Sequence, residues 1–423
     1  MIALLNARDQ RYQKIKDLLS KYPLIITIKP NTPGEDKQTK ESYILVKIFY
    51  QVIKQALTIK HQDFQDNGEG PVFLLCFDSL DPIQIKKQMI DIESHHPLGR
   101  LIDLDVFASH KSISRKELGY PNRMCYLCHQ DAHICARNQN HTVSELQFFI
   151  SNSIKTYIKS FIMKMIDDSI MSELDLEYKF GCVTKTSSGS HIDMNYELMI
   201  EAKQALLPYF IDIFFLAFNE HHTYNLFSQA RKIGKKAEIA MLHATNGVNA
   251  YKGLIFILGC LLLGMGLDLS QKSIKSSLFQ IVKDISKPVE NDFLSSEQTF
   301  GMYAFKTYQI KGARGEVLDG FPTLQDMLIK YKGKDIKSDH LLRMIFIDII
   351  LTTDDTVLLK RSKNMKNYQL FKEKLRMINP LEIEEIKELN KYAIDHHLSQ
   401  GGSADLLVSY LCLTKYYHHF GIN

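Results

Sequence analysis

The spacing of hydrophobic and polar residues changes about one third of the way along the chain. Before that point, residues 24–28 and 72–77 form short apolar runs that are rich in β-branched or aromatic side chains and end at turn residues, as buried strands do. Between these runs, the apolar residues of 43–59 recur at helical spacing. This mixture of strand and helix signals predicts an α/β or α+β domain.

From about residue 143 the pattern becomes one of long helices. Helices are predicted at residues 143–171, 196–218, 237–243, 253–267, 340–351 and 403–420, and Gly-rich loops at residues 187–190, 246–253, 312–322 and 401–402. Few alternating runs lie between the helices. The sequence therefore predicts two domains, an α/β or α+β domain of residues 1–148 and a mostly α-helical domain of residues 149–423.

Composition limits the kinds of partner. The apolar run 253–267 lies between Lys252 and Asp268 and is too short to span a bilayer comfortably, so a buried helix is expected. A formal charge of +4 over 423 residues does not indicate a nucleic-acid-binding protein. Seven cysteines, an odd number, without a secretory segment at the N-terminus favour the reducing cytoplasm over a disulfide framework. We therefore expect a cytoplasmic protein with neither a membrane nor a nucleic acid as partner.

Two aspartates stand out in the first domain. Residues 97–106 read Pro-Leu-Gly-Arg-Leu-Ile-Asp-Leu-Asp-Val, and in a strand Asp103 and Asp105 point to one face while their apolar neighbours point to the other. Two carboxylates on one face suit a magnesium ion. The fork of Arg100, just upstream, suits a phosphate. The alternative is an edge strand with solvated acidic side chains.

Two further motifs accompany the aspartates. The Asn-Thr-Pro-Gly turn at residues 31–34, with Lys37 after it, suits a phosphate, although a plain surface turn fits the same residues. The second motif consists of Cys125, Cys128, Cys135 and His141. Three thiols and an imidazole are ligands for tetrahedral zinc, but the spacing is shorter than in ordinary zinc fingers. Both zinc binding and buried reduced thiols remain open.

Together these motifs resemble the holo-citrate lyase synthase family, often called CitX, over roughly residues 1–148. The matching strings are Gly99-Arg100-Leu101-x-Asp103-Leu104-Asp105-Val106, Ser114-Arg115, Arg123-x-Cys125-x-x-Cys128, Cys135-Ala136-Arg137 and Asn31-x-Pro33-Gly34-x-x-Lys37. The family transfers a phosphoribosyl-dephospho-coenzyme A group to a serine of the acyl carrier (gamma) subunit of citrate lyase and releases diphosphate. The resemblance implies a nucleotidyltransferase-type domain in which Asp103 and Asp105 hold Mg²⁺ against the triphosphate. It also implies that Lys37 and Arg100 clamp phosphate, and that the carrier subunit is a partner.

Five polar islands interrupt the predicted helices of the second domain. They are residues 188–194, 247–253, 312–322, 354–356 and 401–405. Each taken alone is more typical of a helix cap or a turn. Five of them in one helical domain indicate a ligand site, with a flexible turn before an acid/base pair in the first island and a Lys at a helix N-terminus in the second.

The islands together resemble the triphosphoribosyl-dephospho-coenzyme A synthase family, CitG, over about residues 149–423. The specific matches are Gly-Ala-Arg-Gly-Glu at residues 312–316 and Gly-Gly-Ser-Ala-Asp-Leu-Leu at residues 401–407. This family joins ATP to 3'-dephospho-coenzyme A, a ribose hydroxyl of which displaces adenine. The resemblance implies magnesium or triphosphate binding by Asp193, Asp354 and Asp405, ligand contacts by Lys252, Arg314 and Ser403, and proton transfer by His191 and Glu316.

The second domain also departs from its family. Where the family has Pro-Gly-Leu-Val-Asp, this chain has Phe180-Gly181-Cys182-Val183-Thr184, and two family histidines are replaced by Tyr251 and Leu359. The resemblance implies a bifunctional enzyme whose second half makes the activated prosthetic group and whose first half attaches it. The alternatives are a transferase with an inactive synthase half, a non-catalytic regulator that binds ATP or coenzyme A, and a zinc-built interaction module.

Overall fold

The computed structural model describes residues 2–220, 225–294 and 299–422, and the chain divides into two compact units. The first unit comprises Met1–Phe161, Ser270–Ser276 and Tyr417–Asn423, and the second comprises Ile162–Leu269 and Ser277–Tyr416. Each unit is described by itself below. Position 149, where we placed the domain boundary, lies inside the continuous helix α5 (Val143–Leu174).

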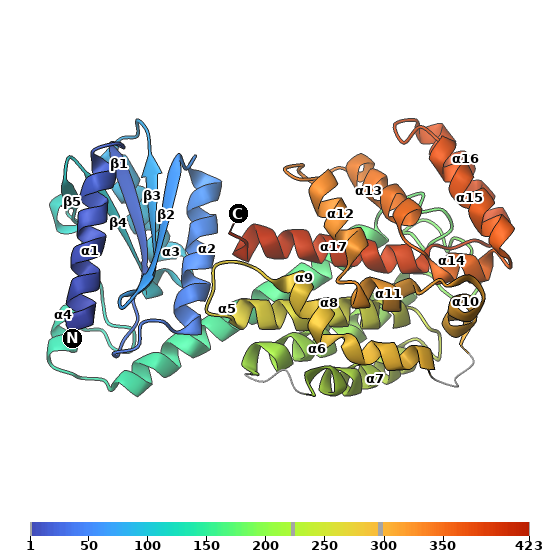
Figure 1. The fold of residues 1–423 in the computed structure, drawn as a ribbon, viewed down its shortest axis with the longest axis horizontal. Coiled ribbons are helices and arrows are strands. Elements are labelled where there is room, and N and C mark those ends of the chain that lie inside the picture. The colour runs from blue at the N-terminus through green and yellow to red at the C-terminus, as the bar shows by residue number, and fades with distance from the viewer. Residues whose placement is uncertain (1, 221–224, 295–298, 423) are drawn as a thin grey trace. The chain divides into compact units, whose positions relative to one another are not determined.

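The first unit combines a small sheet with helices (Figure 1). Its elements are α1 (Ile2–Leu19), β1 (Leu24–Pro30), α2 (Lys40–Ala56), β2 (His61–Asn67), β3 (Gly70–Phe77), α3 (Pro82–His95), the 3-10 helix η1 (Gly99–Leu101), β4 (Ile102–Ala108), β5 (Lys111–Ile113), η2 (Lys116–Leu118) and α4 (Ala132–Arg137). The strands predicted at residues 24–28, 72–77 and 102–106 and the helix predicted at 43–59 are thereby confirmed.

The five strands lie in the order β2-β3-β1-β4-β5, and every neighbouring pair is antiparallel. An antiparallel sheet with its helices outside it is an α+β arrangement, which decides between the two predicted classes. In the register of β1 with β4, Thr27 lies opposite Asp105 and Lys29 lies opposite Asp103. The two aspartates therefore share one sheet face with Thr27 and Lys29.

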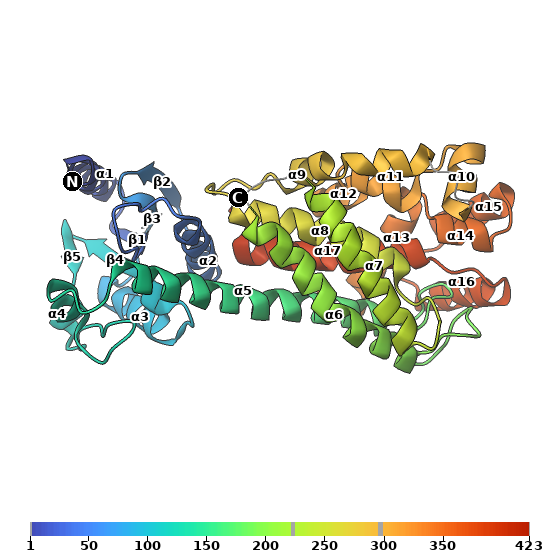
Figure 2. The same ribbon diagram turned by 90° about the horizontal axis from the view of Figure 1, so that it is seen from below.

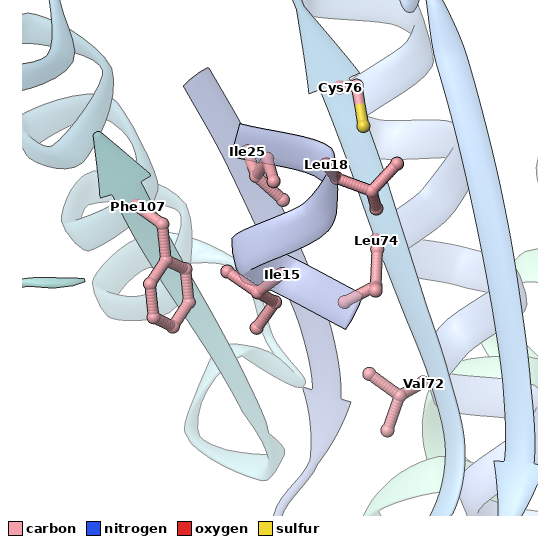
Figure 3. Packing of buried hydrophobic residues seen from close by; sticks show 7 residues of the cluster. All are labelled: Ile15, Leu18, Ile25, Val72, Leu74, Cys76 and Phe107. Carbon is pink, nitrogen blue, oxygen red and sulfur yellow. The ribbon is translucent and has the colours of Figure 1, made fainter. Parts of the chain in front are cut away.

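The two faces of the sheet are covered differently. Figure 2 shows α1 on one side of the sheet and α2 and α3 on the other. On the α1 side, Ile15 and Leu18 pack against Ile25 and Phe107 in a cluster of buried side chains (Figure 3). On the other side, the ring of Tyr50 lies 5.0 Å from that of Phe73. The aspartates of β4 lie on the α1 side, beyond this apolar cluster, and are half-buried.

The second unit is mostly α-helical, as predicted. Its helices are α5 (Val143–Leu174, from residue 162 on), α6 (Tyr196–Asn219), α7 (Leu226–Ala244), α8 (Lys252–Ser270), α9 (Leu278–Ile285), the 3-10 helix η3 (Lys287–Leu294), α10 (Phe300–Tyr308), α11 (Gly312–Leu318), α12 (Pro322–Lys330), α13 (Asp339–Thr352), α14 (Thr356–Arg361), α15 (Met365–Met377), α16 (Ile383–Asp395) and α17 (Gly401–Phe420). All six helices predicted for this part of the chain are present, and the one predicted at residues 237–243 is the end of the longer α7.

Helix α8 forms the core of this unit. Among the described residues it is the one helix with the length and hydropathy of a membrane span, yet 83% of that window is buried inside the protein. A Cβ added to Gly266 would lie 2.4 Å from the backbone oxygen of Phe214, so the absence of a side chain allows α6 to pack closely against α8. The prediction of a buried helix at residues 253–267 is confirmed.

Two predicted loops are instead helical. Residues 312–318 form α11, and Gly401 and Gly402 open α17. At the start of α17 the carboxylate of Asp355 accepts hydrogen bonds from the backbone N–H and the hydroxyl of Ser403, at 2.8 and 2.9 Å. A partner about fifty residues away thus stabilises a Gly-rich first turn that local sequence reasoning assigned to a loop.

Candidate functional site

The aspartate pair of the first unit lies where strand β4 has an open edge. Strand β5 pairs with Val106–Ala108, so within the described part of the chain Leu104 has no strand neighbour on that side. Two side chains of α3 take the place of a strand: Glu93 Oε1 accepts from the Leu104 N–H at 2.7 Å, and Lys86 Nζ donates to the Leu104 carbonyl at 3.0 Å. Buried charges are therefore fixed directly beside the aspartates.

These charges form a network around the pair. The guanidinium of Arg123 forms ion pairs with Asp103 and Glu93 and donates to the carbonyl of Ile102 at 3.0 Å. Lys86 Nζ lies 3.5 Å from Asp105 Oδ1. Burial raises the pKa of Asp103, and Arg123 opposes this effect. The side chains of Asp103 and Asp105 remain 35% and 46% exposed, so both carboxylates can still meet a ligand.

A basic cluster lies near the same sheet face. Burial lowers the pKa of Lys37, and the neighbouring cations Lys29 and Arg8 lower it further. Lys29 Nζ and Arg8 Nε each lie 3.4 Å from an oxygen of the buried Glu69. Arg11 Nε also pairs with Glu69, at 2.8 Å, so three cations share this one carboxylate. The cluster, with Lys37 beside it, therefore carries excess positive charge, which suits a phosphate group.

A cavity of about 610 Å³, here called the β4 cavity, joins the remaining predicted residues of this unit. Its lining includes residues 31–33, Arg100, Arg123, Tyr126 and part of the cysteine-rich segment. Arg100 donates to the carbonyl of Cys125 at 3.1 Å, and the Tyr126 hydroxyl donates to the carbonyl of Asn31 at 3.1 Å. The structure thus brings the predicted turn, Arg100, and Cys125 and Cys135 with His141 to one cavity.

The second unit contains a larger cavity of about 760 Å³ and a smaller cavity of about 530 Å³. The larger cavity is lined by three predicted residues, His191, Lys252 and Asp405, and by further charged residues that we did not predict, Glu173, Lys179, Lys360, Arg361 and Lys363. Among the described residues, only one of these cations is neutralised within the cavity wall, by the ion pair of Lys179 Nζ with Glu173 Oε1 at 2.6 Å. Positive charge is therefore in excess around this cavity.

Asp405 lies deep in the larger cavity. Burial raises its pKa well above the ordinary value, and the nearby carboxylates of Asp355 and Glu173 raise it further. A Cβ added to Gly253 would lie 2.1 Å from Asp405 Oδ2, so only glycine leaves room for this carboxylate at the start of α8. The hydroxyl of Tyr251 is buried in the same cavity and has no hydrogen-bond partner among the described residues.

His191 is held as a neutral imidazole. Burial and the adjacent Arg361 lower its pKa to about 4. Arg361 Nη2 lies 3.0 Å from Nδ1, and Ser399 Oγ lies 3.1 Å from Nε2. Because a guanidinium can only donate, Nδ1 accepts and Nε2 carries the proton. His191 is thus oriented by two neighbours and stays uncharged near pH 7.

Other predicted residues lie elsewhere. Asp193 and Asp354 are exposed and are not part of the lining of either cavity. Ser403 is fully buried, and its hydroxyl and its N–H both donate to Asp355. Asp355 in turn caps α14 by accepting from the first N–H groups of that helix. In this structure Ser403 therefore links two helices in the wall of the larger cavity.

The smaller cavity is lined by Arg314 and Lys252 together with apolar side chains of α8. Lys252 lines both cavities, and its Nζ lies 2.5 Å from Glu238 Oε1. Glu316 lies outside the lining of both, where its carboxylate accepts from the hydroxyls of Thr323 and Thr353 and burial raises its pKa. The structure thus brings Arg314 to a cavity but not Glu316.

The residues that sequence reasoning missed had recognisable signals. Glu173 is a buried acid at the end of the long helix α5, where a charge without a partner would be unfavourable. Lys360 and Arg361 follow the fourth polar island within one short helix. An ionisable group inside an apolar pattern, and a basic pair beside an acidic island, both point to a charged ligand.

Comparison with known proteins agrees with this arrangement. The family model described as apo-citrate lyase phosphoribosyl-dephospho-CoA transferase (CitX) matches residues 1–157, and the one described as ATP:dephospho-CoA triphosphoribosyl transferase (CitG) matches residues 159–422. Protein CitXG of Leuconostoc mesenteroides subsp. cremoris is 30% identical over 98% of this chain and 97% of its own length. Protein CitXG of Haemophilus influenzae is 27% identical over 96% of this chain and 94% of its own length.

A relative of the second unit alone is also similar. The 2-(5''-triphosphoribosyl)-3'-dephosphocoenzyme-A synthase of Haemophilus ducreyi is 27% identical over 66% of this chain and 96% of its own length. These matches confirm both resemblances that the motifs predicted. The chain therefore belongs to the CitX and CitG families of transferases, with the CitX domain preceding the CitG domain in one polypeptide.

Proposed function

We propose that the second unit makes the activated prosthetic group of citrate lyase and that the first unit attaches it to the acyl carrier subunit. The larger cavity carries this proposal, because it combines excess positive charge with buried carboxylates. A triphosphate needs the cations, and a sugar carbon that becomes positive needs a carboxylate beside it. The family descriptions and the full-length CitXG relatives support both halves of the proposal.

In the second unit, ATP occupies the larger cavity. Lys360, Arg361 and Lys363 hold the triphosphate, and Asp405 faces the ribose. A ribose hydroxyl of dephospho-coenzyme A forms a bond to the sugar carbon while the bond from that carbon to adenine breaks, and the hydroxyl proton ends on the departing adenine. The positive charge that develops at the sugar carbon favours the ionised form of Asp405, and the carboxylate in turn stabilises that charge.

The Tyr251 hydroxyl donates a hydrogen bond to the leaving adenine. Its hydroxyl is buried in the larger cavity without a partner among the described residues, and a ligand would satisfy it. Tyr251 stands where the family has a histidine. Because its pKa is raised by burial and by Glu173 and Asp405, the hydroxyl stays protonated and donates a hydrogen bond.

Dephospho-coenzyme A occupies the smaller cavity. Its walls combine the apolar residues Ile255, Phe256 and Leu263 with the cation Arg314, which suits a ligand with both an apolar arm and phosphates. Lys252 lines both cavities, so the two substrates meet at the start of α8. The reaction of one substrate with the other requires such a junction.

Magnesium suits the donor groups of both units. In the first unit, Asp103 and Asp105 present carboxylates on one sheet face, and the buried hydroxyl of Thr27, opposite Asp105, has no hydrogen-bond partner among the described residues. In the second unit, Asp405 offers a carboxylate that two neighbouring carboxylates make unfavourable as a free anion. Magnesium bound at these residues would neutralise charge on phosphate oxygens.

In the first unit, the carrier serine attacks the phosphorus that bears the ribosyl group. A bond forms between the serine oxygen and phosphorus, the bond to the diphosphate breaks, and the serine proton is released. Lys37 and Lys29 hold the diphosphate, and Arg123 keeps Asp103 in position. This is nucleotidyltransferase-type chemistry, and we propose that class for the first unit.

The test uses the purified full-length chain with ATP, dephospho-coenzyme A, magnesium and the apo form of the citrate lyase carrier. Adenine release and a mass increase of the carrier by one phosphoribosyl-dephospho-coenzyme A group are the expected results. An unchanged carrier together with adenine release would contradict the attachment role. Attachment only from preformed precursor would identify a transferase with an inactive synthase half, and ATP binding without either product would identify a regulator.

The Asp103→Asn, Asp105→Asn double variant separates the two units. It should release adenine at the rate of the unmodified protein and fail to modify the carrier. Attachment at an undiminished rate would refute the role of this pair.

A further inference from the structure

Three thiols and an imidazole converge in the first unit. Cys125, Cys128, Cys135 and His141, here called the Cys/His cluster, place their ligand atoms within 4.8 Å of one another. The Sγ atom of Cys135 lies 3.3 Å from that of Cys125 and 3.8 Å from that of Cys128. Two sulfurs that each lie about 2.3 Å from a tetrahedral zinc ion are about 3.8 Å apart. The separations therefore match a metal site, and all three cysteines are free of disulfides.

The backbone around the cluster is shaped for ligation. Met124 and Asp131 form an isolated antiparallel bridge, and the N–H of Cys125 donates to the carbonyl of Gln130 at 2.7 Å. Within this turn, the N–H of Leu127 points at Cys125 Sγ at 3.5 Å. A tight turn whose amides face a cysteine sulfur stabilises a thiolate rather than a thiol.

The buried ring nitrogen of His141 indicates a ligand independently of the distances between the sulfur atoms. Its Nε2 atom is buried and has no hydrogen-bond partner among the described residues. A buried imidazole nitrogen without a partner is unfavourable unless a ligand satisfies it. The ring lies beside three sulfurs, so a metal ion is the ligand that fits.

We propose that the Cys/His cluster binds one structural zinc ion, and that this ion fixes the segment from which Arg123 reaches Asp103. Three sulfurs and one nitrogen complete a tetrahedral shell, which leaves no open position for a substrate. The soft sulfur donors favour zinc over magnesium or calcium. This site is separate from the aspartate pair, whose oxygen donors suit magnesium.

The cluster is linked to the aspartate pair through two arginines. Arg123 stands two residues before Cys125 and forms an ion pair with Asp103. Arg100 donates to the carbonyl of Cys125 at 3.1 Å and lines the β4 cavity. A fixed Cys125 therefore restrains both guanidinium groups. This link rests on the proposed transfer reaction, whereas zinc binding itself does not.

Metal analysis of the purified, tag-free, full-length chain tests the site. We expect about one zinc per chain, and we expect the Cys128→Ser, His141→Ala double variant to retain less than about a tenth of it. His141→Cys should keep the metal, because it supplies a fourth thiolate. Cys76→Ala is the matched control, since Cys76 is a buried cysteine of the first unit outside the cluster.

A second measurement covers the case in which the double variant fails to fold. A thiol-modifying reagent added to the protein without substitutions should release about one zinc ion per chain as the cysteines of the cluster react. A chromogenic zinc chelator measures the released zinc. A metal-free protein with free thiols, a disulfide between two of the cysteines, or iron in place of zinc would overturn the proposal. Full zinc content in the double variant would overturn the ligand set.

The positioning role has its own readout. With preformed precursor, the zinc-depleted variant should lose carrier attachment while adenine release continues at the unmodified rate, and His141→Cys should restore attachment together with the metal. Attachment at the full rate without zinc would refute the link to Arg123 and leave zinc binding itself intact. If the unmodified protein contains zinc but never modifies the carrier, the proposed function fails and the metal site stands.

Discussion

A single methyl group added at Gly253 should strongly slow adenine release. In the Gly253→Ala variant the new Cβ would lie 2.1 Å from Asp405 Oδ2, whereas ordinary van der Waals contact begins at 3.4 Å, so the carboxylate must move by about 1.3 Å. A displacement of about 1 Å at a reacting centre lowers a rate by roughly 100-fold. We therefore expect adenine release to fall about 100-fold.

The effect on stability should be small by comparison. Overpacking of this kind costs about 1–3 kcal/mol, and replacing glycine by alanine in a helix returns up to about 1 kcal/mol. The net loss in the free energy of unfolding should thus be about 0–3 kcal/mol, which leaves the variant folded. Attachment from preformed precursor by the first unit is the internal control and should be unchanged.

A double-mutant cycle isolates the cause. If the overlap with Asp405 is responsible, the destabilisation by Gly253→Ala should disappear in an Asp405→Ala background, with a coupling energy of about 1–3 kcal/mol. Adenine release within about threefold of the unmodified protein, or equal destabilisation in both backgrounds, would refute the steric argument.

Three further predictions concern buried polar groups. Glu93→Gln should lower the free energy of unfolding by about 3 kcal/mol, because the half-buried Arg123 loses its ion pair with the buried Glu93. The exposed Glu117→Gln should change it by less than about 1 kcal/mol in the same denaturation assay, and equal effects of the two variants would contradict this reasoning. Tyr251→Phe should lower adenine release by about 10- to 100-fold without loss of thermal stability, and an unchanged rate would show that the hydroxyl does not meet the substrate. Burial lowers the pKa of His96, His191 and His419 to about 4, below the value of about 6.5 in the unfolded chain, so the unfolded state binds more protons between these values. The free energy of unfolding should therefore be greatest above pH 6.5 and should decline as the pH falls from 6.5 to 5. A melting temperature that stays constant over this range would contradict the lowered pKa values.

Periodicity predicted seven of the seventeen α-helices and three of the five strands that the structure describes, because burial imposes a repeat that is visible along the sequence. The alternation in residues 102–106 placed Asp103 and Asp105 on one face, and the register of β4 with β1 confirms it. The apolar run of α8 likewise predicted a buried helix. Helix α1 was not predicted, because nine of its residues are exposed. Its few buried residues, such as Ile15, give only a weak hydrophobic pattern along the sequence.

The sequence by itself determined the two-part organisation, the strand with its aspartate pair, the helical second unit and both family resemblances, because motifs and periodicities are local. Only the tertiary structure decided which charged residues meet. It brought Glu173 into one cavity with Asp405, left Glu316 outside that lining, and used Asp355 to hold the first turn of α17. Such encounters depend on how distant segments pack, and no local pattern along the chain encodes them.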